Sequence, residues 1–334
     1  MQVKLADVAK HAGVSVTTVS YVLNHPDRVS PAIRTSVRQS IQELGYVRNL
    51  SASALRSGVS SVVAMVVVDI SDPFFSLVAA SVERELGERD LMMTLSSTNS
   101  RREREQSLAR TLAAQRHRGI ILAQTTMDTQ SVREIQAAGI PVVLFDSPQI
   151  EEPAISSVCA DDVSGAASAM KLLMDLGHRE IAFINGPLWA SQAKERLAGV
   201  RLAVEQHPAG DRVHLTAVNT EGWTPLEGRL QLEAILDMPG PRPTAYFCGN
   251  DMIAMGVLNQ LVRLGYSVGH DVSVIGFDDI PLAQELSVPL TTVLRSTEEF
   301  ARASVEILLS DEQPQHRMIE TELVVRESTG PVPA

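Results

Sequence analysis

The sequence predicts a small all-α head at the N-terminus, followed by a larger α/β body. The first 46 residues hold three short segments whose apolar residues recur at helical spacing. From residue 61 onward, continuous apolar runs alternate with amphipathic segments of helical length, a pattern typical of parallel sheets covered by helices. At 334 residues, the chain is long enough for two or three such units.

Each of the three expected head helices has a start or stop signal. Gly13 ends the first helix, and Ser15 is a suitable N-cap for the second. Ser30 followed by Pro31 starts the third, which ends at Gly45. The apolar faces are formed by Leu5, Val8, Ala9 and Ala12, by Val19, Val22 and Leu23, and by Val37, Ile41 and Leu44. Two helices joined by a glycine-containing turn and followed by a supporting helix form the layout of a helix-turn-helix.

Residues 47–60 are predicted to be a linker of marginal helix content. The segment is rich in serine and alanine and contains Gly58 near its end. Its helical part, Leu50–Arg56, is too short to be stable alone in water. The body therefore starts at residue 61.

The body contains apolar runs suited to buried parallel strands. These runs are Val62–Val68, Leu91–Leu95, Gly119–Ala123, Pro141–Phe145, Ile181–Ile184, Ala245–Cys248 and Val272–Phe277. The helical segments between them are Phe75–Arg89, Arg101–Gln115, Val163–Leu176, Lys194–Glu205 and Met252–Leu264. We expect about ten strands in two doubly wound sheets, with a ligand cleft at the carboxyl ends of the strands.

Charge is distributed unevenly between these parts. The net charge is -11, yet residues 1–60 carry +4 and the remainder carries -15. A basic head on an acidic body favours nucleic-acid binding that is confined to the head. No Gly-x-Gly-x-x-Gly follows the first strand and no Walker loop is present, so we expect no nucleotide cofactor.

Several other classes of protein are disfavoured. The two cysteines, Cys159 and Cys248, lie in apolar stretches, and no Cys/His cluster indicates a metal site. No Gly-x-Ser-x-Gly or comparable context supports a catalytic triad, so we do not expect an enzyme. No apolar run approaches the ~18 residues that cross a bilayer, and residues 1–10 have no apolar signal core. We therefore expect a cytoplasmic protein without a membrane partner.

The second helix is the candidate DNA-recognition helix. Val16, Thr17 and Tyr21 fall on the face opposite its apolar residues, where they suit contacts with base edges. Side chains suited to phosphate contacts are Ser15, Thr18, Ser20 and Asn24. The alternative from the pattern alone is an ordinary three-helix bundle with a solvated face.

The chain closely resembles the LacI/GalR family of bacterial repressors over nearly its whole length. The resemblance begins with VKLADVAKHAGVSVTTVSYVLN at 3–24 and continues with VS at 29–30 and ELGY at 43–46. In the body it rests on DISDPFF at 69–75, LGHR at 176–179, ERLAG at 195–199, GND at 249–251, IGFDD at 275–279, PLTTV at 289–293 and LVVRES at 323–328. The motifs occur in the family's order.

This resemblance implies specific DNA contacts. Val16, Thr17 and Tyr21 match the family's base-contacting positions, and Arg28 matches a further operator contact. Leu55 matches the leucine that inserts between base pairs in the minor groove, with Arg56 beside it. A hinge helix in 47–60 would form when two copies pair on DNA. One departure is Arg48, which stands where many members have proline.

The body resembles the periplasmic sugar-binding-protein fold (type I), with two Rossmann-like subdomains. The resemblance implies an N-subdomain of about 61–158 and 290–318, and a C-subdomain of about 159–289 and 319–334. The candidate effector contacts are Phe74, Phe75, Asp146, Arg196, Trp223, Asn250, Asp251 and Asp278. Aromatic faces, carboxylates, an amide and a guanidinium suit a polyhydroxylated or heteroaromatic ligand. Alternatively, Phe75 belongs to the core and Asp251 caps the following helix.

We therefore expect a homodimeric transcriptional repressor that binds a near-palindromic operator and is controlled by a small effector. A sugar or sugar derivative is the expected effector. The alternatives are a regulator that requires a purine or nucleoside corepressor, and a cytoplasmic sugar-binding protein without a role on DNA. Whether the effector releases or recruits the repressor is left open.

Overall fold

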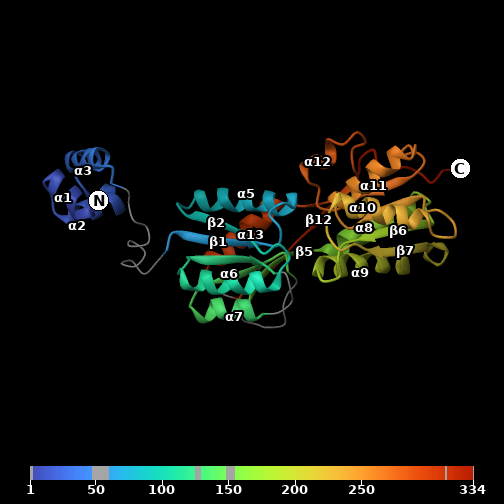
Figure 1. Ribbon diagram of the computed structural model, residues 1–334, viewed down its shortest axis with the longest axis horizontal. Helices are drawn as coiled ribbons and strands as arrows, with labels where there is room; N and C mark the ends of the chain where they lie inside the picture. The colour runs from blue at the N-terminus through green and yellow to red at the C-terminus, as the bar shows by residue number, and fades with distance from the viewer. Residues whose placement is uncertain (1–2, 47–59, 125–128, 148–154, 313, 334) are drawn as a thin grey trace. The chain divides into compact units, whose positions relative to one another are not determined.

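The computed structural model describes residues 3–46, 60–124, 129–147, 155–312 and 314–333. The chain divides into two compact units between Ser60 and Ser61 (Figure 1). The sequence places the start of the body at the same position. The all-α head and the α/β body that the sequence predicts are both present.

The N-terminal unit is a three-helix bundle. Its elements are α1 (Leu5–Ala12), α2 (Val16–Asn24), the 3-10 turn η1 (Pro26–Arg28) and α3 (Pro31–Leu44). One fully buried valine from each α-helix, Val8, Val19 and Val37, forms the centre of its core. Gly13 and Gly45 take left-handed conformations at the ends of α1 and α3.

The first half of the α/β unit is a six-stranded parallel sheet in the order β11-β5-β4-β3-β1-β2. Its strands are β1 (Val62–Val67), β2 (Met92–Ser97), β3 (Gly119–Ala123), β4 (Val142–Phe145), β5 (Ser156–Ala160) and β11 (His316–Ile319). Its helices are α5 (Pro73–Gly87), α6 (Arg102–Ala114), α7 (Gln130–Ala137) and α13 (Thr297–Leu309). α5 and α13 pack on one face, and α6 and α7 pack on the other (Figure 1).

The second half is a four-stranded parallel sheet in the order β7-β6-β8-β9. Its strands are β6 (Glu180–Asn185), β7 (His214–Asn219), β8 (Ala245–Cys248) and β9 (Ser273–Ile275). Its helices are α8 (Asp162–Asp175), α9 (Ser191–Gln206), α10 (Pro225–Leu236), α11 (Asp251–Arg263) and α12 (Pro281–Gln284), with the turn η2 (Gly210–Arg212). α8 and α9 cover one face, and α10 and α11 cover the other.

Two antiparallel strands connect the halves. They are β10 (Thr292–Arg295) and β12 (Thr321–Val324), paired from Thr292 with Val324 to Arg295 with Thr321. β10 leads directly into α13 of the first half. This crossing places Arg295 where the two halves meet. No helix in the described ranges is both long and apolar enough to span a membrane.

Candidate functional site

The head presents a mixed apolar and hydroxyl surface at the start of α2. Val19 and Val22 are buried, which turns the other side of the helix outward. Val16 and Tyr21 are 45% and 44% exposed, and Thr17 is exposed between them. Exposed apolar groups at a helix start suit contact with base edges and thymine methyl groups.

The other predicted DNA-contacting residues have mixed positions. Ser15 is the N-cap of α2, where its Oγ accepts a hydrogen bond from Thr18 N at 3.0 Å. Ser20 is half-buried, Asn24 ends α2, and Arg28 is exposed in η1. Leu55, Arg56 and the proposed hinge helix lie outside the described residues.

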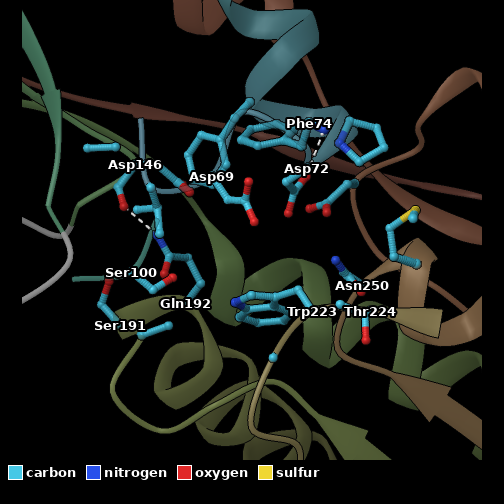
Figure 2. A pocket seen from close by; sticks show the side chains of 18 of the residues that line it. Asp69, Asp72, Phe74, Ser100, Asp146, Ser191, Gln192, Trp223, Thr224 and Asn250 are labelled. Atoms are coloured by element: carbon cyan, nitrogen blue, oxygen red, sulfur yellow. Dashed lines mark hydrogen bonds between the residues drawn. The ribbon is translucent and has the colours of Figure 1, made fainter. Parts of the chain in front are cut away.

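The candidate effector site is a cavity of about 280 Å³ between the two sheets, at the carboxyl ends of their strands (Figure 2). Seven of the eight predicted effector contacts line it: Phe74, Phe75, Asp146, Arg196, Trp223, Asn250 and Asp278. They come from both halves of the α/β unit. Each residue either follows a strand whose carboxyl end faces the cavity or lies on the helix after such a strand. The structure therefore brings together side chains that are far apart in sequence.

Asp251 is the exception. Its Oδ2 accepts a hydrogen bond from Ile280 N at 2.9 Å, and Thr292 donates to its Oδ1 at 2.5 Å. A Cβ on Gly276 would lie 2.2 Å from the same Oδ1. Asp251 thus joins α11 to the crossing strand β10 and does not line the cavity. Nor does it cap α11: the cap is Asn250, whose Oδ1 accepts from Ile253 N at 2.9 Å.

Aromatic side chains form two walls of the cavity. Phe74 is buried and packs edge-to-face on Phe300, with ring centroids 5.8 Å apart. Trp223 lies opposite, in the segment after β7 (Figure 2). A Cβ on Gly186 would fall 2.0 Å from the indole, so only glycine leaves room for this ring.

A buried ion network lies at the base of the cavity. Arg196 Nε is 2.8 Å from Asp162 Oδ1, and Arg196 Nη2 is 3.4 Å from Asp278 Oδ1. Arg295 pairs with Asp146, lies 3.3 Å from Asp278 Oδ1, and approaches Asp162 Oδ2 at 3.9 Å. All five side chains are at most 7% exposed. The network joins both halves, since Asp146 follows β4 and Asp278 follows β9.

Carboxylates around the cavity have raised pKa values. Burial raises the pKa of Asp278 to about 6, against the opposing effect of the Arg196 guanidinium. Burial, and then the Asp278 carboxylate, raise the pKa of Asp72 to about 7. Burial, and then the Asp162 carboxylate, raise that of Glu195 to about 7. For Asp278 and Glu195, burial therefore outweighs the effect of the two arginines, which lower the pKa.

Sequence reasoning missed four residues here: Asp69, Asp72, Asp162 and Arg295. Asp72 caps α5 through Phe74 N at 2.9 Å and lines the cavity, and Arg295 lines it from β10. The available signal was a charged residue directly after or at the end of an apolar strand, as at Arg295. In the described ranges, no group of three or more His, Cys, Asp or Glu side chains is arranged to hold a metal ion.

Comparisons with known proteins cover both units. The profile for bacterial regulatory proteins of the lacI family matches residues 4–49, and that for periplasmic binding protein-like domains matches residues 170–329. The HTH-type transcriptional repressor CytR of Escherichia coli (strain K12) is 31% identical, over 98% of this chain and 97% of its own length.

Two solved structures align over almost the entire chain. The Lac repressor dimer bound to operator and the anti-inducer ONPF gives a TM-score of 0.86 at 27% identity, over 99% of this chain and all of that one. The complex of the transcriptional regulator CelR with cellobiose gives 0.71 at 30% identity, over 98% and 100%. The α/β unit thus has the periplasmic-binding-protein (type I) fold that the sequence predicts. The chain belongs to the lacI family of bacterial regulatory proteins, and it is a DNA-binding transcriptional regulator.

Proposed function

We propose that this regulator is a cytoplasmic repressor that binds a near-palindromic operator as a homodimer and responds to a sugar-like effector. The observation that carries the proposal is the exposed group Val16, Thr17 and Tyr21 on α2, in a head that matches the family profile. The solved Lac repressor, which aligns over the whole chain, is a dimer on its operator. Two heads on one dimer would contact two half-sites related by the same twofold axis.

The effector role is assigned to the cavity between the two sheets. Seven predicted contacts line this cavity, and a similar chain, CelR, is a complex with cellobiose in its solved structure. Carboxylates and amides bind hydroxyl groups, while Trp223 offers an aromatic surface for an apolar part of the ligand. The proposed N-subdomain, 61–158 with 290–318, and C-subdomain, 159–289 with 319–334, form its two sides.

The effector would control DNA binding because it contacts both halves of the α/β unit at once. An effector that binds one relative arrangement of the halves more tightly shifts the population toward it. We assign transmission of this shift to the segment 47–60, which joins the two units. No enzymatic step is needed for this role, and we propose none.

The test is selection of short palindromic duplexes by the purified full-length protein, followed by titration at several salt concentrations. We expect a selected duplex to bind at least about a thousandfold more tightly than random duplex, with both affinities falling as salt rises. Absence of any preferred duplex, with and without candidate sugars, would contradict the proposal.

Base contact by Thr17 has a separate test. Thr17→Ala should weaken binding to the selected duplex by about 5- to 150-fold and change random-duplex binding little, because only base contacts distinguish sequences. Thr111→Ala, an exposed threonine on α6, is the matched control and should leave both affinities unchanged. Equal losses on both duplexes for Thr17→Ala would mean that this side chain contacts the backbone only.

A further inference from the structure

The side chains that line the cavity include more acidic than basic groups. Among the described residues that line it, none is a lysine or a histidine. The acidic lining residues are Asp69, Asp72, Asp146, Glu221 and Asp278, and the basic ones are Arg196 and Arg295. The lining therefore has a formal excess of three negative charges before any proton or ligand is counted.

Both guanidinium groups are already engaged by carboxylates. Arg295 pairs with Asp146 and Asp278, and Arg196 pairs with Asp162 and Asp278. Their faces are also covered, because Arg295 lies over Phe74 at 4.1 Å and Arg196 over Phe277 at 3.8 Å, measured to the ring centroids. An anionic ligand would have to displace these internal pairs, which makes such a ligand a poor fit.

The carboxylates of Asp69 and Asp72 face the open part of the cavity (Figure 2). Neither forms an ion pair with any described lysine, arginine or histidine. Asp69 accepts hydrogen bonds from Ser71, and Asp72 accepts one from Phe74 N. Asp69 and Asp72 therefore both border the space available to a ligand, and no cationic side chain of the described residues lies between them.

The opposite side of the cavity offers an amide and the Trp223 ring, over which Arg196 Cζ lies 5.5 Å from the centroid. Figure 2 shows Trp223 and Asn250 across the space from Asp69 and Asp72. Asn250 is 2% exposed, and its Oδ1 is used by Ile253 N, whereas its Nδ2 has no hydrogen-bond acceptor among the described residues. A donor that opens into a cavity can bind a ligand that supplies an acceptor, such as a hydroxyl oxygen.

We propose that the effector is a hydroxylated organic cation, such as an amino sugar or amino alcohol. Its ammonium group lies between the carboxylates of Asp69 and Asp72 and the Trp223 ring. Carboxylates and an indole face are the two partners that bind ammonium groups best in proteins. A hydroxyl of the same ligand accepts from Asn250 Nδ2. This inference rests on the proposed function, in which the cavity holds the effector.

The pH dependence of binding separates a cationic from a neutral effector. Asp72 faces the carboxylates of Asp69, Asp146 and Asp278, and its pKa of about 7 means that the empty site retains a proton near neutral pH. Arg196 and Arg295 are the cations that line the same cavity. A bound cation lowers this pKa and releases the proton, so its affinity rises with pH. A neutral ligand leaves the proton in place and gains nothing as pH rises.

The test uses three probes of one carbon skeleton and different charge: 1-amino-1-deoxyglucitol, glucitol and gluconate. Glucosamine and glucose form a second matched pair. Binding to the full-length protein is measured by thermal shift and calorimetry from about pH 6 to about pH 8. We expect the amine to bind at least about tenfold more tightly than its neutral and anionic counterparts, and its affinity to rise with pH.

Matched variants test which carboxylates bind the ammonium group. Asp72→Asn keeps the helix cap, because asparagine caps as well as aspartate, and Asp69→Asn removes the neighbouring carboxylate. Each should reduce the preference for the amine at least about tenfold. Glu306→Gln, an exposed carboxylate on α13, is the control and should retain it. Unfolding temperatures without probe verify that each variant is folded.

Three results would overturn the inference. They are equal or tighter binding of the neutral or anionic probes, an affinity of 1-amino-1-deoxyglucitol that rises as pH falls, and absence of a response to every amine. The proposed function is judged separately, by selection of an operator and by a change in operator affinity with any sugar-like probe, charged or neutral. A repressor that selects an operator and responds only to neutral sugars would refute the cationic effector and leave the proposed function intact.

Discussion

At Arg295, one buried guanidinium contacts carboxylates from both halves of the α/β unit. The residue is 2% exposed, and its partners Asp146 and Asp278 follow strands of different sheets. A buried ion network adds little net stability when complete, but loss of one member leaves the others unpaired in a poorly solvated site. The network contains three carboxylates and only two guanidinium groups, so it is sensitive to the loss of a cation.

Arg295→Gln should therefore lower the free energy of unfolding by about 3–5 kcal/mol. Equilibrium unfolding in urea at neutral pH measures the change. The control is Arg302→Gln, since Arg302 is exposed and lies 3.8 Å from Glu299 on the same helix; its loss should cost less than about 1 kcal/mol. A loss below 1 kcal/mol for Arg295→Gln would mean that the remaining carboxylates take up protons at little cost.

Gly186 determines the position of Trp223. Because a Cβ at this residue would lie 2.0 Å from the ring, Gly186→Ala should displace the indole from the cavity wall. Tryptophan emission in a Trp189→Phe background reports this displacement directly, as the chain has two tryptophans. Gly222→Ala is the control: its Cβ would meet nothing within 4 Å. An emission spectrum unchanged by Gly186→Ala would contradict the packing described here.

At the scale of single elements, Ser15 stabilises the start of α2, whereas Thr17 lies on its exposed face. Ser15→Ala removes the N-cap bond to Thr18 N and should cost about 1 kcal/mol. Amide hydrogen exchange of the head in the full-length protein should then speed up by about fivefold. Thr17→Ala should leave exchange unchanged, because Thr17 is exposed. Equal exchange in the two variants would show that the cap is energetically unimportant.

The elements that the sequence predicts well are those buried on both faces. The apolar runs at 62–68, 119–123, 181–184 and 245–248 coincide with β1, β3, β6 and β8 to within one or two residues. β5, β7, β10, β11 and β12 are not among the predicted runs. β7 and β11 are edge strands with exposed residues, whereas β5 is an inner buried strand with two serines and no continuous apolar run. Hydrophobic pattern detects apolar runs, so it misses both partly buried strands and buried strands of small polar residues.

Part of the cleft lining is predictable from the sequence. Residues such as Asp146, Asn250 and Asp278 directly follow apolar runs, and in a parallel sheet these positions meet at one edge. The pairing of Arg295 with Asp146 spans 149 residues, and no local pattern encodes it. The same holds for Asp251, which follows a strand in sequence but turns to Thr292 and Ile280.

For the whole molecule, the raised carboxyl pKa values predict how stability depends on pH. The pKa values of Asp72, Asp278 and Glu195, at about 7, 6 and 7, exceed the usual value near 4. The folded protein therefore holds protons that the unfolded chain releases, and their contribution to stability is lost as pH rises from about 4 to about 7. Each retained proton contributes a slope of at most about 1.4 kcal/mol per pH unit.

Urea unfolding at a series of pH values measures this slope. Asp72→Asn should make the decline in stability between about pH 5 and about pH 8 shallower than in the wild type, because it removes one of the groups that retains a proton. Glu306→Gln should leave the decline unchanged. A decline that is identical in the wild type and in Asp72→Asn would show that Asp72 holds no proton in the folded state.

The separation of DNA binding from effector binding is testable by removing the head. Each unit has buried clusters of its own, so a chain that begins at Ser61 should fold, with cooperative unfolding in a circular dichroism melt. It should still respond to the amine probe, because every residue that lines the cavity lies in this unit. Residues 61–334 carry a net charge of -15, which repels phosphate, so binding to the selected duplex and to random duplex should both disappear. Retention of duplex binding by this shortened chain would place the DNA contacts in the body and contradict their assignment to α2.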